Sequence, residues 1–114
     1  MKKALFILTL AAVTFFIACS KKASPAKVKL TTYTVDIAPL LQAKCAPCHM
    51  PSKNGRKADF ENYESAKRHA TQMLDRVLMD PGQRGFMPFK KTMKLSDSTI
   101  AVFKQWRADG LLEK

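Results

Sequence analysis

The feature that most constrains this chain is a group of two cysteines and one histidine within five consecutive residues. Two residues separate Cys45 from Cys48, and His49 follows the second cysteine directly. This is the C-x-x-C-H form, in which two thiols add to the vinyl groups of a haem and the adjacent imidazole binds the iron. The spacing lets both sulfurs reach one edge of the macrocycle. The motif therefore predicts a domain folded around one covalently attached haem c.

Three other roles of a C-x-x-C pair compete with this interpretation. A redox dithiol of the thioredoxin kind is expected within a βαβ pattern, which the sequence lacks. A structural zinc site needs about four Cys or His ligands, and beyond the motif only His69 remains as a histidine. A structural disulfide between Cys45 and Cys48 leaves the adjacent His49 unexplained. The motif favours haem over these three roles.

The N-terminal segment has the composition of a bacterial export signal. Two lysines precede an apolar run over residues 4–18, which is short for a transmembrane helix. The run ends at Cys19, in a context that resembles the bacterial lipobox, where a cysteine is acylated and becomes the new N-terminus. We therefore expect export to the periplasm or cell surface, with a lipid on Cys19 anchoring the protein to a bacterial membrane. The expected organisation is a signal peptide over 1–18, a lipidated tether over 19–33 and a haem domain over 34–114.

The chain is strongly basic, with 20 Lys and Arg residues against 9 Asp and Glu residues and a formal net charge of +11. A basic balance suits nucleic acid, an anionic membrane surface or an acidic protein partner. Export makes nucleic acid the weakest of these, so we expect none. If Cys19 takes a lipid and the two motif cysteines take haem, no free thiol remains to oxidise in an exported protein.

The pattern of apolar residues predicts a small all-α domain of three to four helices. The first helix begins near Asp36, a candidate N-cap, and its apolar stripe leads into both cysteines. The second covers about 62–79, and the last follows Ser96 as N-cap and stops at Gly110. The apolar stripe of the second helix consists of Tyr63, Ala66, Ala70, Met73, Leu74, Val77 and Leu78, and that of the last of Thr99, Val102, Phe103 and Trp106. Residues 50–61 and 83–95 are predicted loops.

Met87 is the best candidate for a second axial ligand. It lies in the run Gly-Phe-Met-Pro-Phe at 85–89, where the glycine allows a close approach and the proline stiffens the chain. The two phenylalanines of this run can pack against an apolar porphyrin. Met73, by contrast, lies in the stripe of the second helix, where methionine commonly fills the core. His69 is the competing ligand, although its place on the flank of that stripe is typical of an ordinary polar residue.

The C-x-x-C-H motif, the downstream Met-Pro pair and a short C-terminal helix with a central Trp106 resemble the class I cytochrome c family over roughly 34–113. Residues 37–41 and 95–110 more narrowly resemble haem domains of bacterial cytochromes found in multidomain planctomycete and bacteroidete proteins. The resemblance implies an all-helical fold with crossing N- and C-terminal helices and haem in the cleft. It also implies thioethers at Cys45 and Cys48, with His49 as proximal and Met87 as distal ligand. The family often orients its proximal histidine with the carbonyl of a proline that follows the motif, and between the motif and Met79 the only proline is Pro51.

Two filled axial positions favour electron transfer over oxygen binding or peroxide turnover, so we expect an electron carrier and not an enzyme. The alternative is a haem-based sensor or peroxidase-like enzyme in which the distal methionine is displaced. A third possibility is a basic lipoprotein with an incidental disulfide. Lys90, Lys91 and Lys94 follow Met87 closely, and we expect them to steer an acidic redox protein or respiratory complex toward the haem edge.

Overall fold

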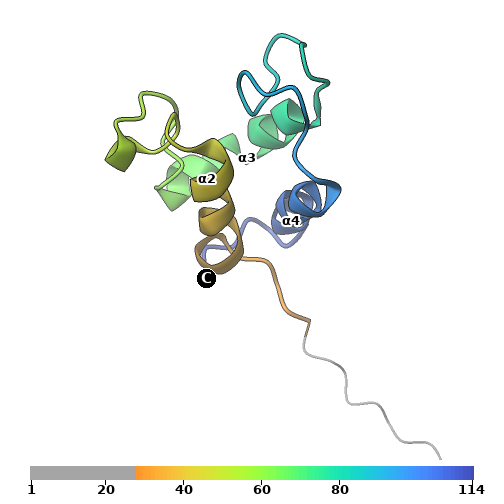
Figure 1. Ribbon diagram of the computed structural model, residues 1–114. Coiled ribbons are helices and arrows are strands. Elements are labelled where there is room, and N and C mark those ends of the chain that lie inside the picture. The colour runs from red at the N-terminus through yellow and green to blue at the C-terminus, as the bar shows by residue number, and fades with distance from the viewer. Residues whose placement is uncertain (1–27) are drawn as a thin grey trace, which may run out of the picture.

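The fold is described for residues 28–114 of a computed structural model, so Cys19, the signal segment and most of the tether lie outside the described residues. A π-helical turn, η2 (Tyr33–Ile37), leads into α2 (Ala38–Cys45), and a short 3-10 turn, η3 (Pro51–Lys53), follows. Two longer helices, α3 (Tyr63–Leu78) and α4 (Asp97–Ala108), complete the chain (Figure 1). Residues 28–114 contain no strand, only an isolated parallel bridge between Thr32 and Leu112. The prediction of a small all-α fold is confirmed, with three α-helices in this part of the chain.

Helix α3 begins and ends within one residue of its predicted bounds. The side chain of Asn62 caps it by accepting a hydrogen bond from the Ser65 backbone N–H at 3.0 Å. The predicted stripe faces the core from Ala66 to Val77, while Leu78 is 41 % exposed because it lies beyond the packed face. None of the helices formed by residues 28–114 is long and apolar enough to cross a membrane.

Helix α4 confirms both predicted end signals. The Ser96 hydroxyl accepts a hydrogen bond from the Thr99 backbone N–H at 3.3 Å, and the chain leaves the helix through Gly110 at φ +89°. The buried face consists of Ile100, Phe103 and Trp106. Ile100 is an addition to the predicted face, on which Thr99 and Val102 are only half-buried.

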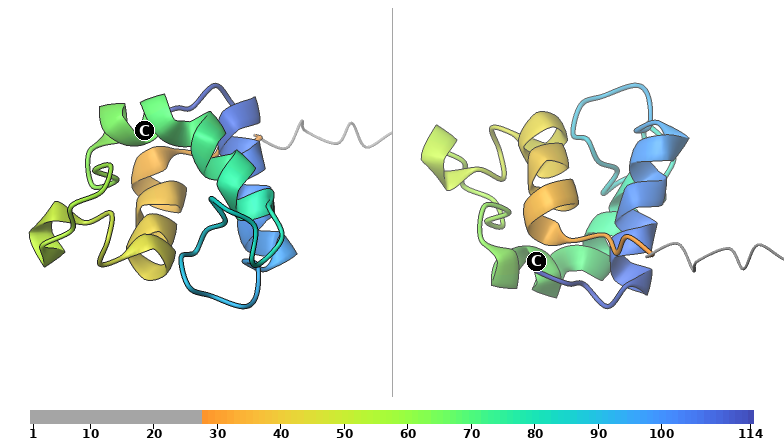
Figure 2. Two further views of the ribbon diagram at one scale, coloured as in Figure 1. Left: turned by 90° about the horizontal axis from the view of Figure 1, so that it is seen from above. Right: turned by 90° about the horizontal axis from the view of Figure 1, so that it is seen from below.

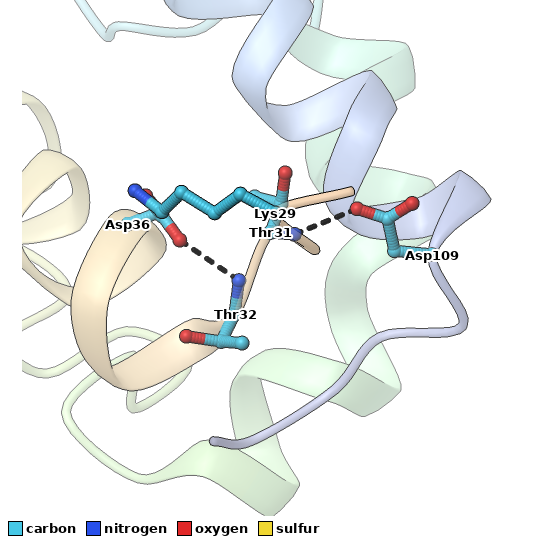
Figure 3. Close-up of polar contacts among 5 residues, drawn as sticks. All are labelled: Lys29, Thr31, Thr32, Asp36 and Asp109. Atoms are coloured by element: carbon cyan, nitrogen blue, oxygen red, sulfur yellow. Dashed lines mark hydrogen bonds and ion pairs between the residues drawn. The ribbon is translucent and has the colours of Figure 1, made fainter. Parts of the chain in front are cut away.

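The start of the first helix differs from the prediction. Asp36 does not cap α2, whose N-cap position is Ile37 without a side-chain hydrogen bond. Instead, the Asp36 carboxylate accepts from the Thr32 backbone N–H at 2.9 Å and pairs with Lys29 at 3.3 Å (Figure 3). The reason is the wide π turn, which places the backbone N–H of Thr32 within reach of this carboxylate and delays the α-helix to Ala38.

The two ends of the described chain are joined. The Thr31 N–H donates to the Asp109 carboxylate at 2.7 Å (Figure 3). The Tyr33 N–H donates to the Leu112 carbonyl at 2.8 Å. Tyr33 is buried and its ring centroid lies 6.1 Å from that of Trp106. Residues 31–33, expected at the end of the tether, therefore belong to the packed domain.

The core lies where η2 and α3 pack against α4. It consists of Tyr33, Ile37, Leu41, Met50, Phe60, Ala66, Ala70, Met73, Leu74, Val77, Ile100, Phe103 and Trp106. The C-terminus and the start of η2 lie at one end of the domain (Figure 1), whereas the loops 46–62 and 79–96 project at the end where α2 finishes (Figures 1 and 2). This arrangement places the C-x-x-C-H motif and the loop of Met87 on the same side of the molecule.

Candidate functional site

The C-x-x-C-H motif forms the last residue of α2 and the tight turn that follows it. The turn is closed by hydrogen bonds from the His49 N–H to the Cys45 carbonyl at 3.2 Å and from the Met50 N–H to the Pro47 carbonyl at 3.0 Å. Cys45 is half-buried against the core and Cys48 is exposed, and both are free thiols. The turn therefore presents two thiols and one imidazole at the end of a single helix.

The His49 ring is held by the backbone of the following loop. Its Nδ1 lies 2.9 Å from the carbonyl oxygen of Ala58. Because a carbonyl oxygen can only accept a hydrogen bond, Nδ1 is the donor, and in the neutral imidazole this leaves the lone pair on Nε2. Histidines that bind metals are commonly oriented by such a contact from the other ring nitrogen. The sequence did not identify the acceptor for the His49 ring. In the structure this acceptor is the carbonyl of Ala58 and not that of a proline.

Phe60 covers one face of the same imidazole. The two ring centroids are 4.2 Å apart and the planes differ by 5°, which is a stacked arrangement. The Phe60 side chain is 7 % exposed, and its backbone N–H donates to the His49 carbonyl at 3.0 Å. The Tyr33 hydroxyl donates to the Phe60 carbonyl at 2.8 Å. The backbone of Phe60 is thus held by hydrogen bonds at both its N–H and its carbonyl.

The loop over 50–61 lies directly against the motif turn. The Lys57 N–H donates to the Cys48 carbonyl at 3.1 Å, and the Gly55 N–H donates to the Met50 carbonyl at 3.0 Å. A Cβ at Gly55 would lie 2.4 Å from the Pro47 carbonyl oxygen and 2.7 Å from that of Cys48. Only glycine lets the loop approach the motif this closely.

The environment of Cys45 bears on the redox-dithiol alternative. Burial raises the pKa of the Cys45 thiol to about 11, so the thiol stays protonated at neutral pH. Cysteines that exchange disulfides act as thiolates and have lowered pKa values. Cys45 lacks this property, which disfavours a thioredoxin-like role for the pair.

The other candidate ligand histidine, His69, is engaged within its own helix. Its Nδ1 lies 2.8 Å from the Ser65 carbonyl oxygen, and its half-buried ring packs at 6.1 Å from the ring of Phe60. These contacts agree with the interpretation of His69 as an ordinary polar residue on the flank of the apolar stripe. Among residues 28–114, no three His, Cys, Asp or Glu side chains form a group that could hold a metal ion.

Met87 lies on the loop 79–96, which is anchored to α3. Its backbone N–H donates to the Arg76 carbonyl at 3.1 Å, and its half-buried side chain packs against the core cluster. The two phenylalanines beside it differ in environment, since Phe86 is buried and Phe89 is 64 % exposed. The loop lies on the side of the molecule where α2 ends (Figure 2).

The remaining methionines divide between the core and the surface. Met50 and Met73 are buried in the core cluster, which the sequence predicted for Met73. Met93 is 77 % exposed. Met79 is half-buried, and a Cβ at Gly85 would lie 3.5 Å from its sulfur. Met79 precedes Met87 by eight residues, and Met93 follows it by six.

The three lysines after Met87 are exposed but not equivalent. Lys94 forms an ion pair with Asp80, with 2.6 Å between Nζ and Oδ1. Lys90 and Lys91 line a hollow of about 610 Å³ inside the loop, together with Arg84 and Phe89. Sequence reasoning missed a second basic group beside Cys48. It lines a hollow of about 260 Å³ and includes Lys53, Arg56 and Lys57.

Comparisons of this chain with protein-family models, with curated proteins and with solved structures give no match.

Proposed function

We propose that this protein is a mono-haem c-type cytochrome lipoprotein, which carries single electrons between redox partners in the periplasm or on the outer surface. The observation that carries the proposal is the turn at the end of α2. There Cys45 and Cys48 are free thiols, and the Nδ1 of His49 is bound to the Ala58 carbonyl so that Nε2 keeps its lone pair. Thioether formation and iron binding require this set of groups.

The chemistry of the donor set fits a covalently attached haem. Each thiol would add its S–H across one vinyl group of the haem, with the sulfur bonded to one vinyl carbon and the hydrogen to the other, so that no external oxidant is needed. Cys48 is exposed and Cys45 is half-buried at the edge of the core, so both sulfurs lie at the boundary between the core and solvent. His49 supplies Nε2 as the proximal donor, from a ring that its neighbours already orient.

Met87 is the proposed distal ligand, because its loop lies on the side of the molecule where the motif turn ends. Haem iron supplies a one-electron couple between its ferric and ferrous states. A thioether donor at Met87 favours the ferrous state relative to a second imidazole, which raises the potential. If His49 and Met87 both hold the iron, no coordination site would remain for oxygen or peroxide. This ligand set suits an electron carrier.

The proposed partner is an acidic redox protein or a respiratory complex. Lys90 and Lys91 are exposed on the loop of Met87, whereas Lys94 is paired with Asp80. Transient redox complexes are small and use complementary charge to speed encounter. We therefore assign the main steering role in this loop to Lys90 and Lys91. The proposed lipid on Cys19 would hold the protein at a bacterial membrane.

Mass spectrometry of the denatured protein tests covalent attachment. The full chain is expressed with export and haem-maturation machinery and compared with Cys45→Ala, Cys48→Ala and the double variant. We expect the wild-type mass to include one haem that denaturation does not release, and the double variant to carry none. A wild-type polypeptide without added haem under these conditions would contradict the proposal.

The alternative function is a haem-based sensor or peroxidase-like enzyme in which Met87 leaves the iron. The observation that favours it is the position of Met87 on a loop rather than on a helix. Carbon monoxide binding by the reduced protein distinguishes the two functions. An electron carrier with a firmly bound methionine should bind carbon monoxide weakly, whereas ready binding would favour the sensor or enzyme.

A further inference from the structure

The imidazole of His49 is restrained in two independent ways. The hydrogen bond from Nδ1 to the Ala58 carbonyl fixes the direction of one ring nitrogen. The stacked ring of Phe60, at 4.2 Å and 5° between planes, opposes rotation of the imidazole about its bond to Cβ. A hydrogen bond alone leaves a range of tilt, because carbonyl acceptors tolerate a broad range of donor directions. The stacking contact therefore restrains the tilt of the imidazole plane, which the hydrogen bond alone does not fix.

Phe60 is held by two backbone hydrogen bonds in addition to its packing in the core. Its N–H donates to the His49 carbonyl, and its own carbonyl accepts the Tyr33 hydroxyl at 2.8 Å in a buried setting. A buried carbonyl that loses its donor is costly, because its desolvation is no longer offset by a hydrogen bond. Tyr33 in turn is fixed by its N–H bond to the Leu112 carbonyl. A chain of contacts thus leads from the paired ends of the domain through Tyr33 and Phe60 to His49.

We propose that Phe60 is a positioning residue that sets the plane of the His49 imidazole, and that the Tyr33 hydroxyl holds Phe60 in place. This inference rests on the proposed function, in which His49 Nε2 binds haem iron. The π orbitals of an axial imidazole overlap with iron d orbitals, so the ring plane determines how unpaired spin is distributed over the macrocycle. Rotation of the ring changes that distribution without removing any ligand.

Proton NMR of the ferric holoprotein provides the test, because the chemical shifts of the haem methyl groups report the spin distribution. The visible spectrum of the wild type is recorded first. Its failure to show c-type haem would reject the proposed function, a result distinct from failure of this inference. With haem present, Phe60→Leu is expected to keep the visible spectrum and to change the spacing of the methyl resonances. Phe60→Tyr, which retains a ring for stacking, should restore the wild-type pattern.

Phe103→Leu is the matched control, because Phe103 is a buried ring on α4 and its removal also weakens the core. It should leave the methyl pattern unchanged. An unchanged pattern in Phe60→Leu would overturn the inference. So would an equal change in Phe103→Leu, since the effect would then reflect general loosening of the core.

A milder pair of variants covers the case in which Phe60→Leu does not fold. Tyr33→Phe removes the hydroxyl that donates to Phe60, whereas Tyr63→Phe removes one that donates to the Leu111 carbonyl, also at 2.8 Å. The two rings are neighbours, with centroids 5.6 Å apart. We expect Tyr33→Phe to shift the methyl resonances in the direction of Phe60→Leu and Tyr63→Phe to leave them in place. Indistinguishable spectra for the two variants would contradict the role of Tyr33.

Discussion

His49 is oriented by three residues of the loop that follows it. Ala58 accepts its Nδ1–H, Phe60 stacks on its ring, and Gly55 lets the loop close against the motif turn. Two of these contributions come from the main chain and not from a distinctive side chain. The proximal side of the site is therefore assembled by loop conformation, and small changes in the loop should affect it.

Replacement of Gly55 by alanine tests this dependence. The new Cβ would meet backbone atoms of Pro47, Cys48 and Met50 at 2.4–2.8 Å, so the loop or the motif turn must move. We expect a loss of about 1–3 kcal/mol in the free energy of unfolding, as for other overpacked sites, together with less attached haem. Denaturant unfolding and the haem content of the exported protein measure the two effects.

The control for this prediction is Gly82→Ala. No atom outside its chain neighbours lies within 4 Å of a Cβ at Gly82, whose φ of +93° makes backbone strain the main cost. Gly82→Ala should therefore lose some stability but keep the haem content of the wild type. Equal haem loss in the two variants would show that close approach at Gly55 is not the cause.

The chemistry-bearing residues were the part of the site that the sequence could predict, because C-x-x-C-H has a fixed spacing. Ala58 could not be predicted, since its contribution is a carbonyl oxygen that every residue carries. The loop over 50–61 was predicted, but the contacts of Gly55 and Phe60 depend on how that loop folds back, which no periodicity encodes. The pairing of Lys94 with Asp80 depends likewise on the path of a loop.

Among the elements, the helices were predicted best where a strong apolar stripe coincides with a capping residue. Helices α3 and α4 meet both conditions, with Asn62 and Ser96 as caps. The first helix was placed too early, because Asp36 has the residue type of an N-cap but lies within a π turn. Local sequence does not distinguish the α from the π hydrogen-bond pattern at such a position.

The loop 79–96 carries the two lysines that we propose to bind the redox partner. Replacing Lys90 and Lys91 with glutamate should slow reduction by an acidic partner, most strongly at low ionic strength where screening is weak. Stopped-flow mixing with the partner over a range of salt concentrations measures the effect. Reversing Lys104 and Arg107 together to glutamate, at exposed positions on α4, changes the net charge by the same amount and is the matched control. A double variant that reacts no more slowly than this control would reject the steering role.

At the scale of the whole molecule, the domain is closed by the contacts between its two ends. Asp36 and Asp109 accept the N–H groups of Thr32 and Thr31, respectively (Figure 3). These hydrogen bonds are the main cause that lowers the pKa of each carboxyl below its ordinary value of 3.8. A carboxyl with a lowered pKa in the folded state stabilises the fold above its unfolded pKa, and this contribution is lost as the pH falls through the folded value.

The free energy of unfolding should therefore fall as the pH drops below 3.8. Asp36→Asn and Asp109→Asn together should weaken the fold at neutral pH and flatten its pH dependence in this acidic range. Urea unfolding at a series of pH values measures both effects. Asp75→Asn, at an exposed position on α3, should keep the wild-type pH profile. A steep acid transition that persists in the double variant would show that other carboxyls are responsible.

The most direct test of the account is the visible spectrum of the exported protein, oxidised and reduced, for the wild type, Met87→Ala and Met79→Ala. We expect a c-type spectrum in all three, with the weak far-red band of methionine–iron(III) ligation lost only in Met87→Ala. Met79 is the control because it is a second methionine at the start of the same loop, with its sulfur 3.5 Å from where a Cβ at Gly85 would lie. A haem spectrum that is indifferent to Met87→Ala would move the distal ligand to His69 or another methionine. The absence of haem from the wild type would contradict the account as a whole.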